Sequence, residues 1–291
     1  MTTLWKWMLP GLGALCWTVL PSQEPEPVVP RNFGAERTHI FPHDAREFKG
    51  WRHHGAPMWT VNPELPNDVF TFARLRYPVR KRGRWTADYP EAELNFSYRL
   101  HHLTSIQVNP YPVIVDIDAE QLRHYPFIYV SEPQNMNISD EQAKILRDYM
   151  LNGGFLMIDD FWSDQEWNEF APSFKKLWPD RDYVELSPEH PIFHVVFDLP
   201  VLPQAHSNVY VDEMRRLGRT RITNEVRKGT ETPHFRAVYD DKGRMVMIIC
   251  LNNDLGDGWE QEKSDPYYFT EVSEKYAYPL GINIVFYVLT H

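Results

Sequence analysis

Acidic, amide and hydroxyl side chains follow three apolar runs of this sequence, at the points where those runs end. The runs cover residues 127–130, 155–158 and 245–251. In an open parallel sheet, ligands bind beyond the carboxyl ends of the strands, so these residues are the candidates for a binding or catalytic pocket. They are Ser131, Glu132, Asp159, Asp160, Trp162, Asn253, Asp254, Trp259 and Glu260.

Two kinds of chemistry suit such a group of carboxylates. Carboxylates held close together raise one another's pKa, which lets one of them donate a proton near neutral pH. The same oxygen atoms could bind a hard cation such as Ca²⁺ or Mg²⁺. Purely structural roles remain open, because Asp159 and Asp160 could turn the chain and 253–258 could be a glycine-rich loop. The segment does not have the spacing of an EF-hand calcium loop.

The strands that must position these residues are predicted from hydrophobic patterning. Residues 69–77 alternate roughly between apolar and polar side chains. The runs 113–117, 127–130 and 155–158 are short and rich in β-branched and aromatic residues, which is typical of buried strands.

Helices are predicted between and after these strands. Ser139 and Gln142 have the spacing of a capping box, and Gly153-Gly154 supply a left-handed end to that helix. Ser163 is predicted to cap a second helix, which Pro172 should break. Strand, helix, strand and helix joined by short segments predict an α/β fold, with a mostly parallel sheet covered by helices on both faces.

The last third of the chain adds a hairpin and a helix to this unit. Asp240-Asp-Lys-Gly243 separates the runs 235–239 and 245–251 and is a good hairpin turn. Residues 279–289 are predicted to form an apolar helix with proline in its first turn. We therefore expect the main domain to span residues 69–291.

The first 22 residues are predicted to be a secretory signal. Lys6 precedes a mostly apolar stretch, 7–20, that contains one proline and two glycines and is shorter than the about 20 residues of a membrane span. Export to the periplasm or outside the cell follows, with an uncleaved N-terminal anchor as the alternative. Residues 23–68 are predicted to be a linker and an irregular arm packed on the main domain.

Charge and cysteine content exclude some classes of function. The chain has 40 acidic and 30 basic residues, so nucleic acid, whose phosphates would repel it, is not an expected partner. Cys250 is the only cysteine beyond the signal, so no internal disulfide is expected. It lies in the run 245–251 and is interpreted as a small core residue rather than a nucleophile.

Two other groups of polar residues are interpreted as structural. Six cations within eleven residues could meet an anionic partner or a lipid headgroup, but such a run is more often a solvated loop. The pairs His53-His54 and His101-His102 lack metal-ligand spacing, because adjacent residues on a strand point to opposite faces. The six cations are Arg74, Arg76, Arg80, Lys81, Arg82 and Arg84.

Several segments together resemble a bacterial family of unknown function called DUF4159, over residues 69–291. The resemblance implies a branch of the class I glutamine amidotransferase-like superfamily with a flavodoxin-like sheet, and it implies no activity. The most specific landmark is Gly153-Gly-Phe-Leu-Met-Ile-Asp-Asp160. The others are residues 70–77, Trp85-Thr-Ala-Asp-Tyr-Pro90, His190-Pro-Ile-Phe193, 252–254 with 256–260, and Gly281-Ile-Asn283.

The superfamily resemblance allows one test of chemistry. Its enzymes carry a cysteine nucleophile at a strand-to-helix elbow, with a His-x-Glu pair as partner. If the order of elements is kept, that elbow follows 155–158, where this chain has Asp159-Asp160, and His190-Pro-Ile192 lacks the glutamate. Without a thiolate no thioester can form, so glutamine hydrolysis is not expected.

These observations favour a non-catalytic, extracytoplasmic binding or assembly module that uses the pocket at the carboxyl edge of the sheet. Its partner would be an envelope protein or a small ligand, with no cofactor and with membrane contact only through an uncleaved N-terminus. The alternative is a hydrolase that uses Asp159, Asp160 or Glu260 as acid, base or metal ligand. A plain structural domain is the third hypothesis.

Overall fold

The computed structural model describes residues 45–47, 56–64, 68–80, 85–218 and 229–291. The chain divides into two compact units, residues 1–35 and 36–291, and every described residue belongs to the second. The predicted signal segment 1–22 and the start of the linker therefore lie outside the described residues.

Among the described residues, no helix combines the length and the apolar character needed to cross a membrane.

Within the described residues, seven strands form one sheet in the order β2-β1-β3-β4-β7-β6-β5. The first five strands of that order run parallel, whereas β6 and β5 are antiparallel to their neighbours. The 2-1-3-4 order, extended by β7, is that of a flavodoxin-like doubly wound sheet. The strands are β1 (Ala73–Arg76), β2 (Val113–Asp116), β3 (Phe127–Ser131), β4 (Phe155–Asp159), β5 (Val184–Glu185), β6 (His234–Tyr239) and β7 (Met245–Leu251).

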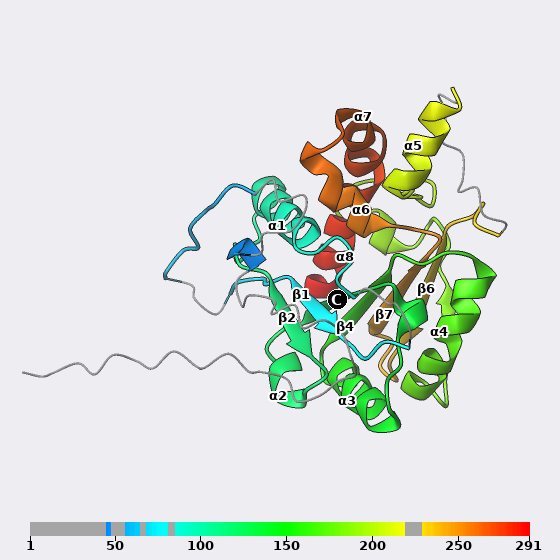
Figure 1. The fold of residues 1–291 in the computed structure, drawn as a ribbon. Coiled ribbons are helices and arrows are strands. Elements are labelled where there is room, and N and C mark those ends of the chain that lie inside the picture. The colour runs from blue at the N-terminus through cyan, green and yellow to red at the C-terminus, as the bar shows by residue number, and fades with distance from the viewer. Residues whose placement is uncertain (1–44, 48–55, 65–67, 81–84, 219–228) are drawn as a thin grey trace, which may run out of the picture. The chain divides into compact units, whose positions relative to one another are not determined.

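Helices cover both faces of the sheet, which confirms the predicted α/β fold (Figure 1). One hydrophobic cluster joins the sheet to α1, α6 and α8, and a second cluster joins it to α2, α3 and α4. The helices are α1 (Glu91–Leu103), α2 (Ala119–Leu122), α3 (Asp140–Leu151), α4 (Ser163–Leu177), α5 (Asn208–Arg216), α6 (Leu255–Glu260), α7 (Pro266–Tyr268), a π-helix (Phe269–Ala277) and α8 (Tyr278–Thr290).

The side chains of β4 alternate between the two faces of the sheet, so this strand contributes to both hydrophobic clusters. Phe155 and Met157 pack in the cluster on the α1, α6 and α8 face, while Leu156 and Ile158 pack on the other. Because side chains of a strand alternate between faces, Asp159 continues the face of Phe155 and Met157. The end of β4 therefore directs a carboxylate toward the layer that contains α6.

The capping box of α3 is confirmed. The Ser139 hydroxyl accepts a hydrogen bond from the Gln142 backbone N–H, and the Gln142 side chain accepts one from the Ser139 N–H. Gly153 follows the helix at φ +110°, a conformation that glycine adopts at little cost. These local signals place β4 one short turn after α3.

Two predictions about α4 are wrong. Ser163 is its first residue rather than its cap, because the Ser163 backbone N–H donates to Asn252 Oδ1 over 2.7 Å. Pro172 does not end the helix, which continues to Leu177. Phe170 and Phe174 bury the same face on both sides of the proline, and Pro172 itself is exposed, so water can reach the carbonyl that loses its donor.

The basic run is not simply a solvated loop, as the sequence suggested. Arg74 is completely buried and forms an ion pair with Glu93 of α1. Arg76 holds Asp116 of β2 through two hydrogen bonds of 2.5 Å. Pairing with a carboxylate explains both cations, of which only Arg74 is buried, and residues 81, 82 and 84 lie outside the described residues.

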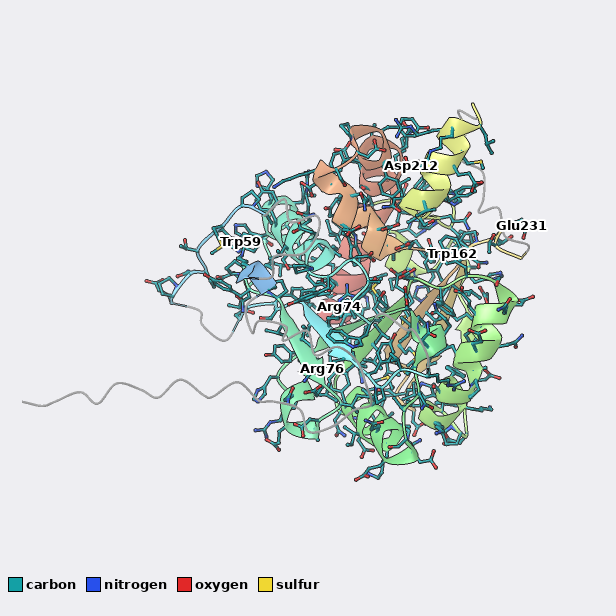
Figure 2. All side chains as sticks on the ribbon, in the orientation of Figure 1. Trp59, Arg74, Arg76, Trp162, Asp212 and Glu231 are labelled. Carbon is teal, nitrogen blue, oxygen red and sulfur yellow. The ribbon has the colours of Figure 1, made fainter. Side chains whose placement is uncertain are left out.

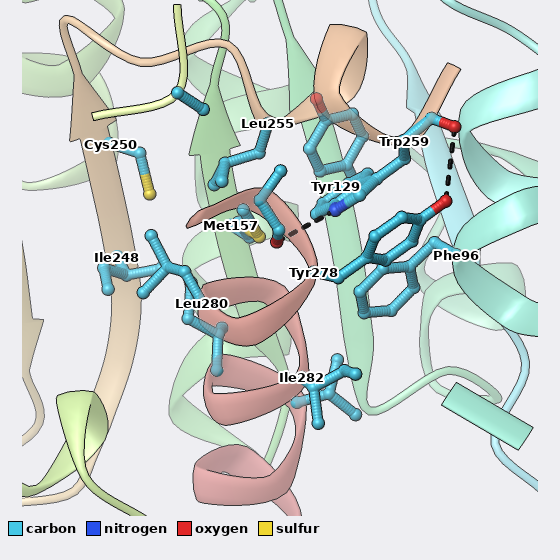
Figure 3. Packing of buried hydrophobic residues seen from close by; sticks show 14 of the residues in the cluster. Phe96, Tyr129, Met157, Ile248, Cys250, Leu255, Trp259, Tyr278, Leu280 and Ile282 are labelled. Carbon is cyan, nitrogen blue, oxygen red and sulfur yellow. Dashed lines mark hydrogen bonds between the residues drawn. The ribbon is translucent and has the colours of Figure 1, made fainter. Parts of the chain in front are cut away.

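The hairpin and the core position of Cys250 are confirmed (Figure 3). Asp240 and Arg244 close the turn between β6 and β7 with a 2.9 Å backbone hydrogen bond. Cys250 has no exposed surface, and burial, followed by the charge of Asp159, raises the pKa of its thiol well above the usual value. A thiol in that position does not act as a nucleophile.

Candidate functional site

Five carboxylates meet beyond the carboxyl ends of β4 and β7, in two groups that share Asp88. In each group, one oxygen atom per residue lies within 4.8 Å of the others. We call these five residues the acidic cluster. The groups are Asp88, Asp160 and Asp254, and Asp88, Asp257 and Glu260.

Strand pairing places Asp160 in the cluster. Residue Ser131 at the end of β3 pairs with Asp159 at the end of β4, so the two strands end together. The Ser131 hydroxyl donates to Asp160 Oδ2 over 3.0 Å. Asp160 has φ +60° and Glu132, after β3, has φ +49°; both are left-handed conformations that are uncommon for residues other than glycine.

Asp159 lies beneath the cluster and joins β4 to the start of α6. Its Oδ2 atom accepts hydrogen bonds from the Tyr129 hydroxyl (2.9 Å) and from the backbone N–H groups of Leu255 (2.9 Å) and Gly256 (3.2 Å). Complete burial raises the pKa of Asp159 to about 6, although these hydrogen bonds favour the ionised form. Asp159 therefore fixes the position of α6, which carries part of the cluster.

The α6 segment supplies three members of the cluster at intervals of three residues. Asp254 caps the helix by accepting from the Asp257 N–H over 2.8 Å. Asp257 Oδ2 accepts from the Asn208 N–H, at the start of α5, over 2.7 Å. Residues three apart share one side of a helix, so Asp254, Asp257 and Glu260 can face the same ligand. This spacing was visible in the sequence, but only its first and last members were selected.

Asp88 comes from the loop before α1 and was missed by the sequence analysis. It has φ +63°, and the carbonyls of Trp85 and Ala87 accept hydrogen bonds from Arg74 Nη1 over 2.9 and 2.7 Å. Because it lies well beyond the end of β1, the strand-end rule does not select it. Its only sequence signal is its place within the family landmark 85–90.

The Oδ2 atom of Asp88 is enclosed and has no hydrogen-bond partner among the described residues. It lies against Gly256, where an added Cβ atom would be only 2.3 Å away. The Oδ1 atom of Asp159 is likewise enclosed, without a hydrogen bond from any part of the chain that the structure describes. Buried carboxylate oxygens without a donor are costly, so each such carboxylate is stabilised by holding a proton or by meeting a cation.

Arg74 is the buried cation beside the cluster (Figure 2). Its guanidinium carbon lies 4.9 Å from the centroid of the Tyr129 ring. The positive charge of Arg74 lowers the pKa of Asp88 and so offsets part of the rise that burial and the neighbouring carboxylates cause. Arg74 thus connects β1, the Asp88 loop and α1, but it already has Glu93 as its carboxylate partner.

Burial and mutual repulsion disfavour ionisation of the cluster. Burial, followed by the charges of neighbouring carboxylates, holds the pKa values of Asp88, Asp160 and Asp254 well above the usual range. The largest of these neighbouring charges are Asp257 for Asp88, Glu132 for Asp160 and Asp160 for Asp254. Protons can relieve the repulsion, and so can a bound cation.

Three of the residues selected from the sequence have structural contacts instead. Trp259 has no exposed surface and packs in the core beside Phe96 and Tyr129, donating from its indole to the Ala277 carbonyl over 3.0 Å, so it does not line a pocket (Figure 3). Asn253 Oδ1 accepts from the Ala205 N–H over 2.9 Å. Trp162 is 5% exposed and belongs to the turn before α4.

In protein stripped of divalent cations, we expect the free energy of unfolding to fall as pH rises from about 6.5 to 8.5. The pKa values of Asp88, Asp160 and Asp254 are raised in the folded state, so the folded chain holds protons that the unfolded chain has lost. Stability present at low pH is then lost as pH rises through the folded-state pKa values, by about 1.4 kcal/mol per pH unit for each excess proton.

The pH window is chosen to separate the cluster from His206. Burial lowers the pKa of His206 to about 4, which contributes the opposite slope between there and the ordinary histidine pKa of about 6.5. Thermal unfolding in the presence of a chelator measures the dependence. A melting temperature that rises with pH across this window would contradict the expected repulsion.

Residues 71–289 match the model of one family, which is described as a domain of unknown function (DUF4159). No curated protein matches the chain.

Proposed function

Because the chain belongs to the DUF4159 family, whose description assigns no activity, we propose its function from the acidic cluster. The protein is a binding module that holds a divalent cation between Asp88, Asp160 and Asp254, and binds an oxygen-bearing ligand through that cation. The observation that carries this proposal is the enclosed Asp88 Oδ2 atom, which lacks a hydrogen-bond donor among the described residues and lies within the carboxylate cluster.

The chemistry of these side chains suits a hard cation. Ca²⁺, Mg²⁺ and Mn²⁺ prefer carboxylate and other oxygen ligands, and the cluster offers carboxylates. Ca²⁺ takes six to eight ligands and Mg²⁺ takes six, so a group of three protein residues leaves coordination positions for water or for a ligand. A cation would also remove the repulsion that raises the carboxylate pKa values.

Titration of the full chain with single metals tests this proposal. Protein treated with a chelator and dialysed is titrated with Ca²⁺, Mg²⁺ and Mn²⁺ by isothermal calorimetry, and its thermal unfolding is followed with and without each metal. We expect saturable binding of at least one metal together with a raised melting temperature. Absence of both binding heat and thermal shift for all three metals would overturn the proposal.

Asp241→Asn is the matched control for charge removal. Asp241 lies in the β6–β7 turn, at the opposite end of β7 from the cluster, and its side chain is 89% exposed. Its loss changes the net charge as a cluster variant does, so we expect unchanged metal binding. An equal loss of binding in Asp241→Asn would show that binding depends on overall charge rather than on the cluster.

Gly256→Ala should weaken metal binding about tenfold or more without removing any carboxylate. Its Cβ atom would lie 2.3 Å from Asp88 Oδ2 and 2.8 Å from the Tyr129 hydroxyl, so Asp88 must move. A displacement of about 1 Å is enough to spoil a coordination geometry that the surrounding residues hold in place. Calorimetric titration measures the affinity, and wild-type affinity in a folded Gly256→Ala protein would remove Asp88 from the metal site.

A hydrolase is the second candidate, and the coordination positions left open in each group of three carboxylates favour it. A metal-bound water in such a position can become a nucleophile near neutral pH. Release of p-nitrophenol from p-nitrophenyl phosphate or acetate, dependent on Mn²⁺ and lost in Asp160→Asn, would support hydrolysis. Turnover that is absent, or equal in the variant, counts against it and favours the binding module.

Two further parts of the proposal rest on the sequence. Export is supported by Lys6 and the apolar stretch 7–20, and fractionation of cells that retain the protein in the cytoplasm would contradict it. A place among non-hydrolytic relatives of class I glutamine amidotransferases is supported by Asp159-Asp160, which occupies the expected position of the nucleophile. Ammonia release from glutamine would contradict that relationship.

A further inference from the structure

We infer that the acidic cluster binds two divalent cations and that the Asp88 carboxylate bridges them. This inference rests on the proposed function, because it requires that the cluster bind metal at all. Its starting point is the division of the cluster into two groups of three, each compact enough to surround one ion, with Asp88 as the only shared member.

Charge balance favours two cations over one. When ionised, the five carboxylates carry five negative charges, and Arg74 beside them is already paired with Glu93. Two divalent cations compensate four of these charges, whereas a single divalent cation compensates only two. Uncompensated charge in a buried position is costly, so a single ion would leave part of the cluster protonated.

The surroundings of Asp88 hold it in the bridging position from two sides. On one side, Arg74 Nη1 binds the carbonyls of Trp85 and Ala87, the second of which immediately precedes Asp88. On the other side, Gly256 leaves room for Asp88 Oδ2 against the α6 backbone. Contacts on both sides thus hold Asp88, whose φ is +63°, where its carboxylate belongs to both groups.

Each group has two members that the other lacks, so each can be weakened separately. Asp160 and Asp254 follow β4 and β7, whereas Asp257 and Glu260 belong to α6. Asp160→Asn removes a ligand from the first group only, and Glu260→Gln removes one from the second only. Paired metal ions in proteins lie about 3.5–4 Å apart, which is close enough for the electron spins of two Mn²⁺ ions to couple.

Mn²⁺ binding to the full chain tests the inference by stoichiometry and by electron paramagnetic resonance. We expect two Mn²⁺ per chain and a spectrum of a spin-coupled pair. In Asp160→Asn and in Glu260→Gln, we expect one Mn²⁺ per chain with the spectrum of an isolated ion. Circular dichroism and thermal unfolding establish that both variants are folded.

The possible failures are distinguishable. One Mn²⁺ per wild-type chain, with the spectrum of an isolated ion, would overturn the second cation and leave the proposed function intact. Two ions without spin coupling would overturn the bridging role of Asp88. No bound Mn²⁺, together with no bound Ca²⁺ or Mg²⁺, would overturn the proposed function itself.

Discussion

Asp88→Asn should make the cation-free protein more stable and, at the same time, abolish the stabilisation by divalent cations. The substituted side chain would retain the shape of the aspartate, and asparagine tolerates the left-handed backbone found at this position. In the cation-free protein, Asp257, Asp160 and Glu260 repel an ionised Asp88, whereas an amide at this position is uncharged at every pH and can donate to these carboxylates. A hydrogen bond to a charged group contributes about 1.5–3 kcal/mol.

The loss of the cation effect should be of similar size to this gain. At a metal concentration a hundred times the dissociation constant, binding stabilises a folded protein by about 2.7 kcal/mol. For a chain of this size, that corresponds to a rise of about 4–5 °C in melting temperature. We expect this rise in the wild type and in Asp241→Asn, and almost none in Asp88→Asn.

Differential scanning calorimetry of the three proteins, each with chelator and with Mn²⁺, measures both effects. The combination of higher stability in chelator with loss of the stabilisation by Mn²⁺ is informative, because a variant that merely damages the fold would be less stable under both conditions. If Asp88→Asn lowers the melting temperature in chelator and keeps the full response to Mn²⁺, then Asp88 is a structural residue and not a ligand.

Arg74→Met should cost about 3–5 kcal/mol of stability, the amount associated with removing one partner of a buried ion pair. Arg74 and Glu93 are both fully buried, so methionine would leave the Glu93 carboxylate without its cation. The carbonyls of Trp85 and Ala87 would also lose their donor. The loop that carries Asp88 would then be held less firmly, and metal affinity should fall with stability.

The double variant Arg74→Met/Glu93→Leu separates the two consequences. Replacing a whole buried ion pair by apolar residues is often nearly neutral, so the double variant should be more stable than Arg74→Met alone. Metal affinity should remain low in both, because neither restores the hydrogen bonds to the Asp88 loop. Chemical unfolding and calorimetric titration measure the two properties. Equal stability of the single and double variants would show that the unpaired Glu93 carboxylate is not what destabilises Arg74→Met.

Much of the fold could be predicted because its signals are local. The capping box at Ser139, the continuous apolar run of β4 and the turn at Asp240–Gly243 each depend on residues close together in sequence. The α4 errors arose where distant contacts decide the outcome. The Asn252 side chain accepts a hydrogen bond from the Ser163 N–H, and core packing before and after Pro172 stabilises the helix across the proline.

From the sequence, only those residues of the candidate site that follow the ends of predicted strands could be selected. Asp160, Asp254 and Glu260 were found by position, and Asp257 had a visible spacing within the same segment. Asp88 could not be found in this way, because its place depends on a buried arginine that binds its loop from β1. Trp259 was misassigned because an indole near a strand end can equally face the core, and here it packs beside Phe96.

Anomalous diffraction from crystals grown with Mn²⁺ tests the central claim most directly. The account predicts a strong peak within coordination distance of carboxylate oxygens of Asp88, Asp160 and Asp254, with a second peak toward Asp257 and Glu260. Crystals with Mn²⁺ in the solution but no peak in the acidic cluster, or with peaks only at surface carboxylates such as Asp241, would contradict it.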